Sequence, residues 1–213
     1  MPSTRFLAWP ILALCWISSG CTIAQVYYDR GVQHQQKGES EAAVEEYSRA
    51  VKIDPAYTEA YMRRADIWSS GGEYDRAIED LTKVIELEPS RTDAFIWRGI
   101  AQMETGEYDS AFRDFGRALE LDPYSARAHN CRAELLTRMD DLAGALGDYS
   151  EAIRVDPKNA LAFYSRGVIH ERMARYPEAI RDYERAAALS SQLAPKAFQR
   201  IDFCRRRLRG PLT

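Results

Sequence analysis

Charged residues have the most regular spacing in this sequence. An arginine recurs at a constant interval of about 34 residues, and an acidic residue follows each arginine at a second constant interval. The arginines are Arg30, Arg64, Arg98, Arg132 and Arg166, and the acids are Glu46, Asp80, Asp114, Asp148 and Asp182. Such a ladder could bind acidic peptides, or each arginine could pair with a carboxylate of its own or the preceding unit. The equal numbers favour pairing, because a half-buried guanidinium needs a fixed partner.

Residue types that commonly catalyse reactions or bind metals do not cluster in the sequence. The three histidines, His34, His129 and His170, form no set with an acid and a nucleophile on adjacent helical turns. The four cysteines form no CxxC pair, and no glycine-rich phosphate loop is present. We therefore predict that the chain is not an enzyme, with no catalytic residues, no metal site, no cofactor and no small-molecule substrate.

The composition predicts a folded protein that does not bind nucleic acid. Of the 213 residues, 46% are hydrophobic, which is enough for a buried core. The 29 basic and 32 acidic residues give a formal net charge of −3. The chain therefore has no overall positive field that could attract phosphate groups.

An acidic residue followed by proline recurs with the same period as the arginines. These pairs are Asp54-Pro55, Glu88-Pro89, Asp122-Pro123 and Asp156-Pro157. Proline ends a helix and biases the residue before it towards extended geometry. Gly38, Gly72 and Gly106 lie between the two apolar runs of their units, where a left-handed residue can end a helix. Each unit is therefore predicted to be a helix, a turn, a second helix and a second turn.

Small and bulky residues follow the same period. The small positions are Gly31, Ala65, Gly99, Ala133 and Gly167, and the bulky positions are Tyr47, Leu81, Phe115, Tyr149 and Tyr183. A small residue in mid-helix lets two helix axes approach, and a bulky residue fills the space beside that contact. Together with the period and the prolines, these columns resemble the tetratricopeptide repeat. Asp140 and Ala174 depart from the pattern, since they replace the turn glycine.

The resemblance implies an all-α fold, a right-handed α-α superhelical solenoid of about five helix pairs plus a C-terminal capping helix. The predicted repeats are residues 24–57, 58–91, 92–125, 126–159 and 160–193. Residues 194–213 are expected to form the capping helix and a basic tail.

Residues 1–20 have the layout of a signal peptide. Arg5 precedes an apolar run over residues 6–17, which spans about 18 Å as a helix and is shorter than the hydrocarbon layer of about 30 Å. The sequence Ser18-Ser19-Gly20-Cys21 resembles the lipobox of bacterial lipoproteins, although Ser18 stands where leucine is usual. We expect a covalent lipid on Cys21 and a short linker over residues 21–23. Cleavage after Ala24 and a membrane signal anchor remain as alternatives.

The resemblance also implies a binding surface. In this family the first helices of successive repeats line the concave side, and ligands bind there. The corresponding positions, which we expect to be exposed, are Tyr28, Val32, Met62, Asp66, Ile96, Ile100, Met103, Asn130, Glu134, Tyr164 and Val168. This strip is apolar near its middle, which favours a peptide or helical segment of another protein as the ligand. Packing of the strip within the chain, or against a second copy in a homodimer, is the alternative.

Taken together, these features predict a protein-interaction scaffold or adaptor. We expect it to be exported to the bacterial cell envelope, on the periplasmic or outer surface, and attached to the membrane through its N-terminal lipid. The alternatives are a signal-anchored scaffold with cytosolic repeats and a self-associating structural repeat protein. An envelope enzyme is the least favoured alternative.

Overall fold

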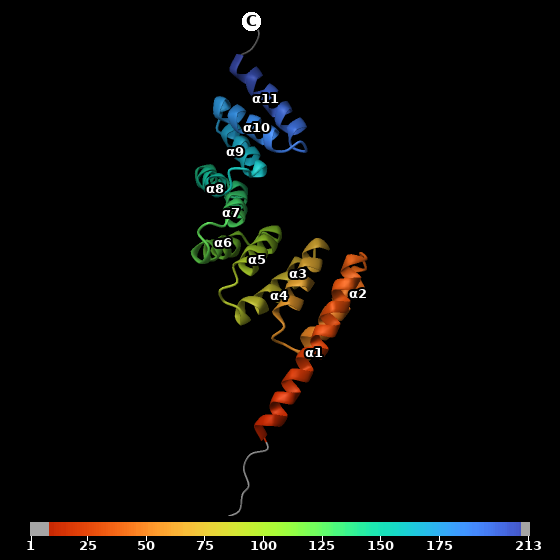
Figure 1. The fold of residues 1–213 in the computed structure, drawn as a ribbon. Helices are drawn as coiled ribbons and strands as arrows, with labels where there is room; N and C mark the ends of the chain where they lie inside the picture. Colours follow the sequence, from red (N-terminus) through yellow and green to blue (C-terminus); the bar gives the residue numbers. More distant parts are fainter. Residues whose placement is uncertain (1–8, 210–213) are drawn as a thin grey trace, which may run out of the picture. The chain divides into compact units, whose positions relative to one another are not determined.

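The computed structural model describes residues 9–209, with side chains over residues 22–209. This part of the chain forms eleven α-helices and no strand (Figure 1), which confirms the predicted all-α fold of helix pairs. The helices are α1 (Trp9–Gln36), α2 (Ser40–Ile53), α3 (Thr58–Ser70), α4 (Tyr74–Leu87), α5 (Thr92–Thr105), α6 (Tyr108–Leu121), α7 (Ala126–Arg138), α8 (Leu142–Val155), α9 (Ala160–Arg172), α10 (Tyr176–Leu189) and α11 (Ala194–Arg209). The start of the predicted signal peptide, the side chain of Cys21 and the end of the predicted basic tail lie outside the described residues.

The helix starts follow the period of the sequence. Each of the helices α3, α5, α7, α9 and α11 begins one full period after the one before, at Thr58, Thr92, Ala126, Ala160 and Ala194. Helix α1 is about twice as long as its counterparts, and it continues through residues 21–23, where we expected a linker. Within the range that the structure describes, no helix has both the length and the apolar character needed to cross a bilayer.

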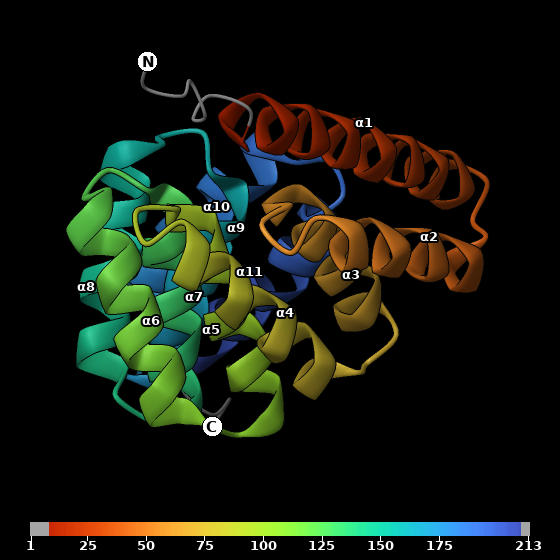
Figure 2. The same ribbon diagram turned by 90° about the horizontal axis from the view of Figure 1, so that it is seen from below.

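The chain divides into two compact units, an N-terminal unit (residues 1–94) and a C-terminal unit (residues 95–213). In the N-terminal unit α1 lies alongside α2, α2 contacts α3, and α3 packs against α4 (Figures 1 and 2). In the C-terminal unit the same neighbour-to-neighbour packing runs from α6 to α11, with α11 lying against α10. Within each unit, these helices therefore bury their apolar faces mainly against the helix before and the helix after.

The small and bulky columns meet inside each repeat. A Cβ atom added to Gly99 would lie 2.7 Å from Phe115, and one added to Gly167 would lie 2.9 Å from Tyr183. Phe115 and Tyr183 are themselves completely buried. The glycines thus let the first and second helices of a repeat approach until the aromatic ring fills the contact.

The turn inside each repeat has a constant backbone conformation. Gly38, Gly72 and Gly106 have φ angles of 77°, 78° and 86°, and Asp140 and Ala174 adopt the same left-handed region with φ of 65° and 58°. The two departures from glycine therefore leave the turn intact, at the energetic cost of holding a side chain in the left-handed region.

Candidate functional site

In repeats 2 to 5 the regular arginines and acids form ion pairs within their own repeats. Arg64 donates to Asp80 through Nε at 2.8 Å and through Nη2 at 2.6 Å, and Arg166 binds Asp182 through the same two atoms at 2.8 Å each. Arg98 and Arg132 bind Asp114 and Asp148 in the same bidentate way. The four aspartates are buried, so this ladder holds the helix pairs together and is not a binding surface for acidic peptides.

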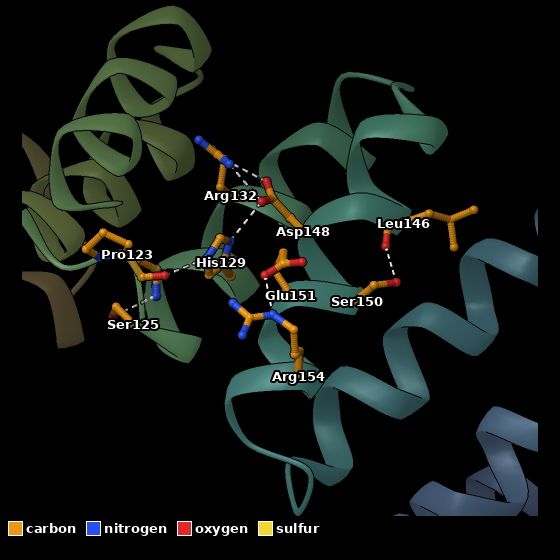
Figure 3. A network of polar contacts seen from close by, with 10 residues as sticks. Pro123, Ser125, His129, Arg132, Leu146, Asp148, Ser150, Glu151 and Arg154 are labelled. Carbon is orange, nitrogen blue, oxygen red and sulfur yellow. Dashed lines mark hydrogen bonds and ion pairs between the residues drawn. The ribbon is translucent and has the colours of Figure 1, made fainter. Parts of the chain in front are cut away.

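Repeat 4 adds a histidine to this pairing (Figure 3). Asp148 accepts from Arg132 and also lies 2.9 Å from Nδ1 of His129, while Nε2 of His129 lies 3.3 Å from the carbonyl oxygen of Pro123. His129 is buried, and its contacts hold the carboxylate and the turn before α7 in place. Among the side chains that the structure describes, no three His, Cys, Asp or Glu residues are grouped so that they could bind a metal ion.

Repeat 1 does not form the predicted pair between Arg30 and Glu46. The Arg30 guanidinium lies over the ring of Tyr27 at 5.6 Å, and Glu46 pairs through Oε1 with Arg49. Glu46 is one methylene longer than the aspartates of the other repeats, and Arg49 lies within one turn of it on the same helix. The other carboxylate oxygen, Glu46 Oε2, is buried without a hydrogen-bond partner among the described residues.

A hollow of about 810 Å³ lies between the first helices α7 and α9 of the C-terminal unit. Its lining residues are Ala126, Arg127, Asn130, Cys131, Glu134, Thr137, Tyr149, Asp156, Asn159, Leu161, Ser165, Val168 and Ile169. Helix α7 provides one wall, α9 provides the other, and Tyr149 from α8 contributes to the lining between them. This volume is within the range of natural ligand sites.

The walls of the hollow combine apolar side chains with a few polar groups. Leu161 is 59% exposed, although it is a large aliphatic residue. The side-chain oxygen of Asn130 is buried and has no hydrogen-bond partner among the described residues. Burial raises the pKa of the Cys131 thiol to about 11, so this cysteine is uncharged near neutral pH. The hollow therefore combines an exposed apolar side chain with a buried amide oxygen that has no hydrogen-bond partner among the described residues.

Tyr149 is slightly more exposed than its counterparts, and its repeat has alanine where theirs have glycine. Its counterparts Tyr47 and Tyr183 face Gly31 and Gly167, and both rings are completely buried. In repeat 4 the facing position is Ala133, whose Cβ occupies space that is empty in the other two repeats. Tyr149 accordingly retains 5% exposure and contributes to the wall of the hollow.

Three of the predicted groove residues, Asn130, Glu134 and Val168, line this hollow. Asp66 lines a separate hollow of about 540 Å³ in the N-terminal unit, together with Trp68 and Arg76. The structure therefore does not bring all the predicted residues into one site.

Three more of the predicted residues pack within the protein. Tyr28 lies 5.7 Å from the ring of Tyr47 and 5.3 Å from that of Tyr57, and Val32 packs against the same apolar cluster. Tyr164 lies 5.4 Å from the ring of Tyr183, which its own repeat supplies. These aromatic contacts belong to the core of each repeat.

The expectation that Met62, Ile96 and Met103 are exposed was wrong. Their exposed fractions are 6%, 3% and 4%, and Ile100 is partly buried. First helices of consecutive repeats contact each other directly, as shown by the 3.0 Å hydrogen bond from Gln35 on α1 to Asp66 on α3. Long apolar side chains on such helices are stabilised by burial within the protein, so an apolar residue at these positions does not by itself indicate an open groove.

The sequence interpretation missed Arg127, Leu161 and Ser165. It used the same positions on every first helix. A hollow between two first helices is instead lined by the side of one helix that faces the following repeat and by the side of the other that faces the preceding repeat. On α9 the side that lines the hollow carries Leu161, Ser165 and Val168, while Tyr164 points towards its own repeat. The helical spacing of these three residues, at i, i+4 and i+7, was the signal available in the sequence.

No protein of curated function matches the chain in sequence. Solved structures share its fold at low sequence identity. MamA from Desulfovibrio magneticus is 18% identical with a TM-score of 0.71, and the match covers 78% of this chain and 94% of that one. PilF from Pseudomonas aeruginosa is also 18% identical with a TM-score of 0.71, over 87% and 90% of the two chains. YrrB, described as a TPR protein with an unusual peptide-binding site, is 22% identical with a TM-score of 0.64, over 81% and 90%.

Family models match the repeats themselves. One model of the tetratricopeptide repeat matches residues 69–126, and a second TPR model matches residues 31–68 and 135–173. Between them the two models cover most of the helix pairs described above. With the constant period of the helices and the small and bulky residues that meet in each pair, these matches show that the chain belongs to the tetratricopeptide repeat family.

Proposed function

We propose that this chain is a protein-interaction scaffold that binds a segment of another protein in the hollow between α7 and α9. The observation that carries the proposal is the combination of the exposed Leu161 with the unpartnered oxygen of Asn130 in one cavity of about 810 Å³. An apolar side chain of the ligand can cover Leu161, and a ligand N–H group can donate to Asn130. Leu161 gains by being covered, and the buried Asn130 oxygen gains a hydrogen-bond partner when its side chain turns towards the ligand.

The walls indicate the type of segment. They are two α-helices, whose own backbone groups are already paired, so the ligand must be recognised by side chains or by its backbone N–H groups. Arg127 and Glu134 place charges of both signs on the α7 wall. A short extended peptide or one face of a helix, with one apolar anchor, fits these features. Peptide binding by a TPR protein of similar fold, YrrB, supports the proposal by analogy.

Site-specific photo-crosslinking tests this site. A photo-reactive residue at Ser165 would lie in the hollow, and one at Tyr124, which is 69% exposed elsewhere in the C-terminal unit, is the matched control. We expect Ser165 to form crosslinks that the control does not form, and Leu161→Glu to abolish them. Crosslinks of equal yield at both positions, or crosslinks that persist in Leu161→Glu, would place the partner elsewhere. Crosslinks between two copies of the chain would favour self-association.

We further propose that the chain is exported and attached to a membrane through lipid on Cys21. The support is the apolar run over residues 6–17 and the small residues that precede Cys21. Metabolic labelling with a fatty acid tests this, with Cys21→Ser as the variant and Cys15→Ser as the control. Label on the wild type and on Cys15→Ser, but not on Cys21→Ser, is expected. An unlabelled wild type would contradict the anchor and favour cleavage after Ala24 or a signal anchor.

A further inference from the structure

The contact between consecutive repeats has a constant apolar part. Ala60 of α3 belongs to one buried cluster with Ala50 and Val51 of the preceding helix α2. Ala162 of α9 belongs likewise to one cluster with Ala152 of α8. The alanines at this position, Ala60, Ala94, Ala128 and Ala162, are completely buried. In repeats 2 and 5 the second helix of the preceding repeat therefore packs against the first helix at this alanine.

In repeats 2 and 5 the same contact also has a polar part. Nη1 of Arg64 donates to Oγ of Ser48 on α2 at 2.8 Å, and Nη1 of Arg166 donates to Oγ of Ser150 on α8 at 3.2 Å. Each arginine thus binds the aspartate of its own repeat and the hydroxyl group of the preceding second helix. The preceding helix supplies both a small apolar surface and a hydrogen-bond acceptor.

In repeat 1 the equivalent face of α1 is not covered by any helix among the described residues. Val26 stands at the alanine position and is 48% exposed, and Ile23, one turn earlier, is 49% exposed. Arg30 is exposed over Tyr27, while the buried oxygen Glu46 Oε2 has no hydrogen-bond partner among the described residues. Both halves of the arginine–carboxylate pair are present, but they are not joined. An uncovered apolar stripe and an unsatisfied buried carboxylate oxygen therefore occur at the same end of the N-terminal unit.

We propose that this face binds an amphipathic helix of a partner protein, which takes the place that a preceding second helix takes in the other repeats. The chain itself specifies the chemistry of that helix. Two of its own second helices, α2 and α8, present a hydroxyl residue, any residue, a small residue and an aliphatic residue in order, as Ser48-Arg49-Ala50-Val51 and Ser150-Glu151-Ala152-Ile153. The docked helix would cover Val26 and offer its hydroxyl group to Arg30, which could then turn onto Glu46. This surface is separate from the hollow between α7 and α9, so the two proposals can fail independently.

A peptide with the sequence of residues 142–159 is the probe, because it contains α8 and the pattern described above. Fluorescence anisotropy with the purified full chain measures binding. We expect saturable binding that Val26→Glu weakens by about tenfold or more, whereas Val26→Ala, which restores the residue of the other repeats, preserves it. A peptide with Ala152→Glu should bind as weakly as the native peptide binds Val26→Glu. Since Val26 is half exposed, neither substitution at this position should alter the thermal melting of the chain.

Two further results separate this face from the hollow and from a contact between two copies of the chain. The variant Leu161→Glu should bind the peptide normally, because it changes only the hollow between α7 and α9. No saturable binding up to about 1 mM peptide, or equal binding by the wild type and Val26→Glu, would overturn the proposal. A dimer of the chain that forms with increasing concentration and is lost in Val26→Glu would assign the face to a second copy instead.

Discussion

Tyr47 lies so close to Gly31 that a Cβ atom on the glycine would come within 2.5 Å of Cε1 of the tyrosine ring. The same relationship recurs between Gly99 and Phe115 and between Gly167 and Tyr183. The missing side chain is therefore part of the packing of three repeats. It sets how closely the first and second helices approach, and with it the depth at which the aromatic ring is buried.

A methyl group at Gly99 should destabilise the protein. In Gly99→Ala the new Cβ would lie 2.7 Å from the completely buried ring of Phe115, and we expect the free energy of unfolding to fall by about 2 kcal/mol. Urea denaturation followed by circular dichroism measures this change. Gly116→Ala is the control on the partner helix α6, because no atom lies within 4 Å of its added Cβ. This variant should be more stable than the wild type by about 1 kcal/mol, since alanine favours a helix interior.

Removing an arginine of the ladder should leave a buried charge. In Arg166→Ala, Asp182, which is 6% exposed, loses both of its hydrogen bonds from the guanidinium group, and we expect a loss of about 3 kcal/mol in unfolding free energy. The control is Arg181→Ala, which removes the exposed pair with Glu178 and should cost less than about 0.5 kcal/mol. Chemical denaturation of both variants gives the comparison. Equal losses would mean that the ladder adds no more than a surface pair.

Glycine at Ala174 should stabilise the last turn within a repeat. Ala174 has a φ angle of 58°, a region in which a side chain costs about 1–2 kcal/mol. After allowing for the greater freedom of glycine in the unfolded chain, we expect Ala174→Gly to gain about 1 kcal/mol. The reverse change, Gly72→Ala at a φ of 78°, should lower stability by a similar amount. Thermal melts that shift the two variants in the same direction would contradict this account.

Acid should destabilise the protein partly through His170. Burial lowers the pKa of His170 from its usual 6.5, an effect that Asp182, 3.8 Å away, and Glu178 oppose and that Arg166 and Arg175 support. The unfolded chain therefore binds a proton more readily than the folded chain as the pH falls below about 6.5, and the stabilising contribution is lost there.

The variant His170→Leu isolates this contribution, because Leu136 occupies the equivalent position in repeat 4. Between about pH 7.5 and pH 5.5, its melting temperature should fall less than that of the wild type. Identical falls would show that His170 does not contribute to the pH dependence.

The sequence was sufficient to predict the fold because its information is periodic. Up to α10, each helix boundary has an acid–proline pair or a left-handed turn residue, so the pattern of one repeat supports the interpretation of the next. Even the replacements of glycine at Asp140 and Ala174 did not alter the turn, since the surrounding helix packing holds the backbone at positive φ. The exchange of partners by Glu46 was harder to predict, because it depends on the length of one side chain and on a competing arginine.

The candidate site was only partly predictable. Asn130 and Glu134, two of the predicted groove residues, line the hollow, but Leu161 was not among the predicted residues and Met103 is buried. The periodic pattern shows which residues occupy equivalent positions. It does not show how neighbouring first helices rotate relative to each other, and that rotation decides which side of each helix lines a cavity.

The alanine at position 133 has a consequence for how such a chain can acquire a new specificity. In repeats 1 and 5, where a glycine contacts the aromatic ring, that ring is completely buried, whereas in repeat 4, which has Ala133 instead, the ring of Tyr149 contributes to a cavity wall. One methyl group can thus change whether the aromatic ring of a repeat is completely buried or contributes to a cavity wall. Exchanging glycine and alanine between repeats would change which repeat exposes its aromatic ring. The residues that contact a ligand could then vary independently of this core position.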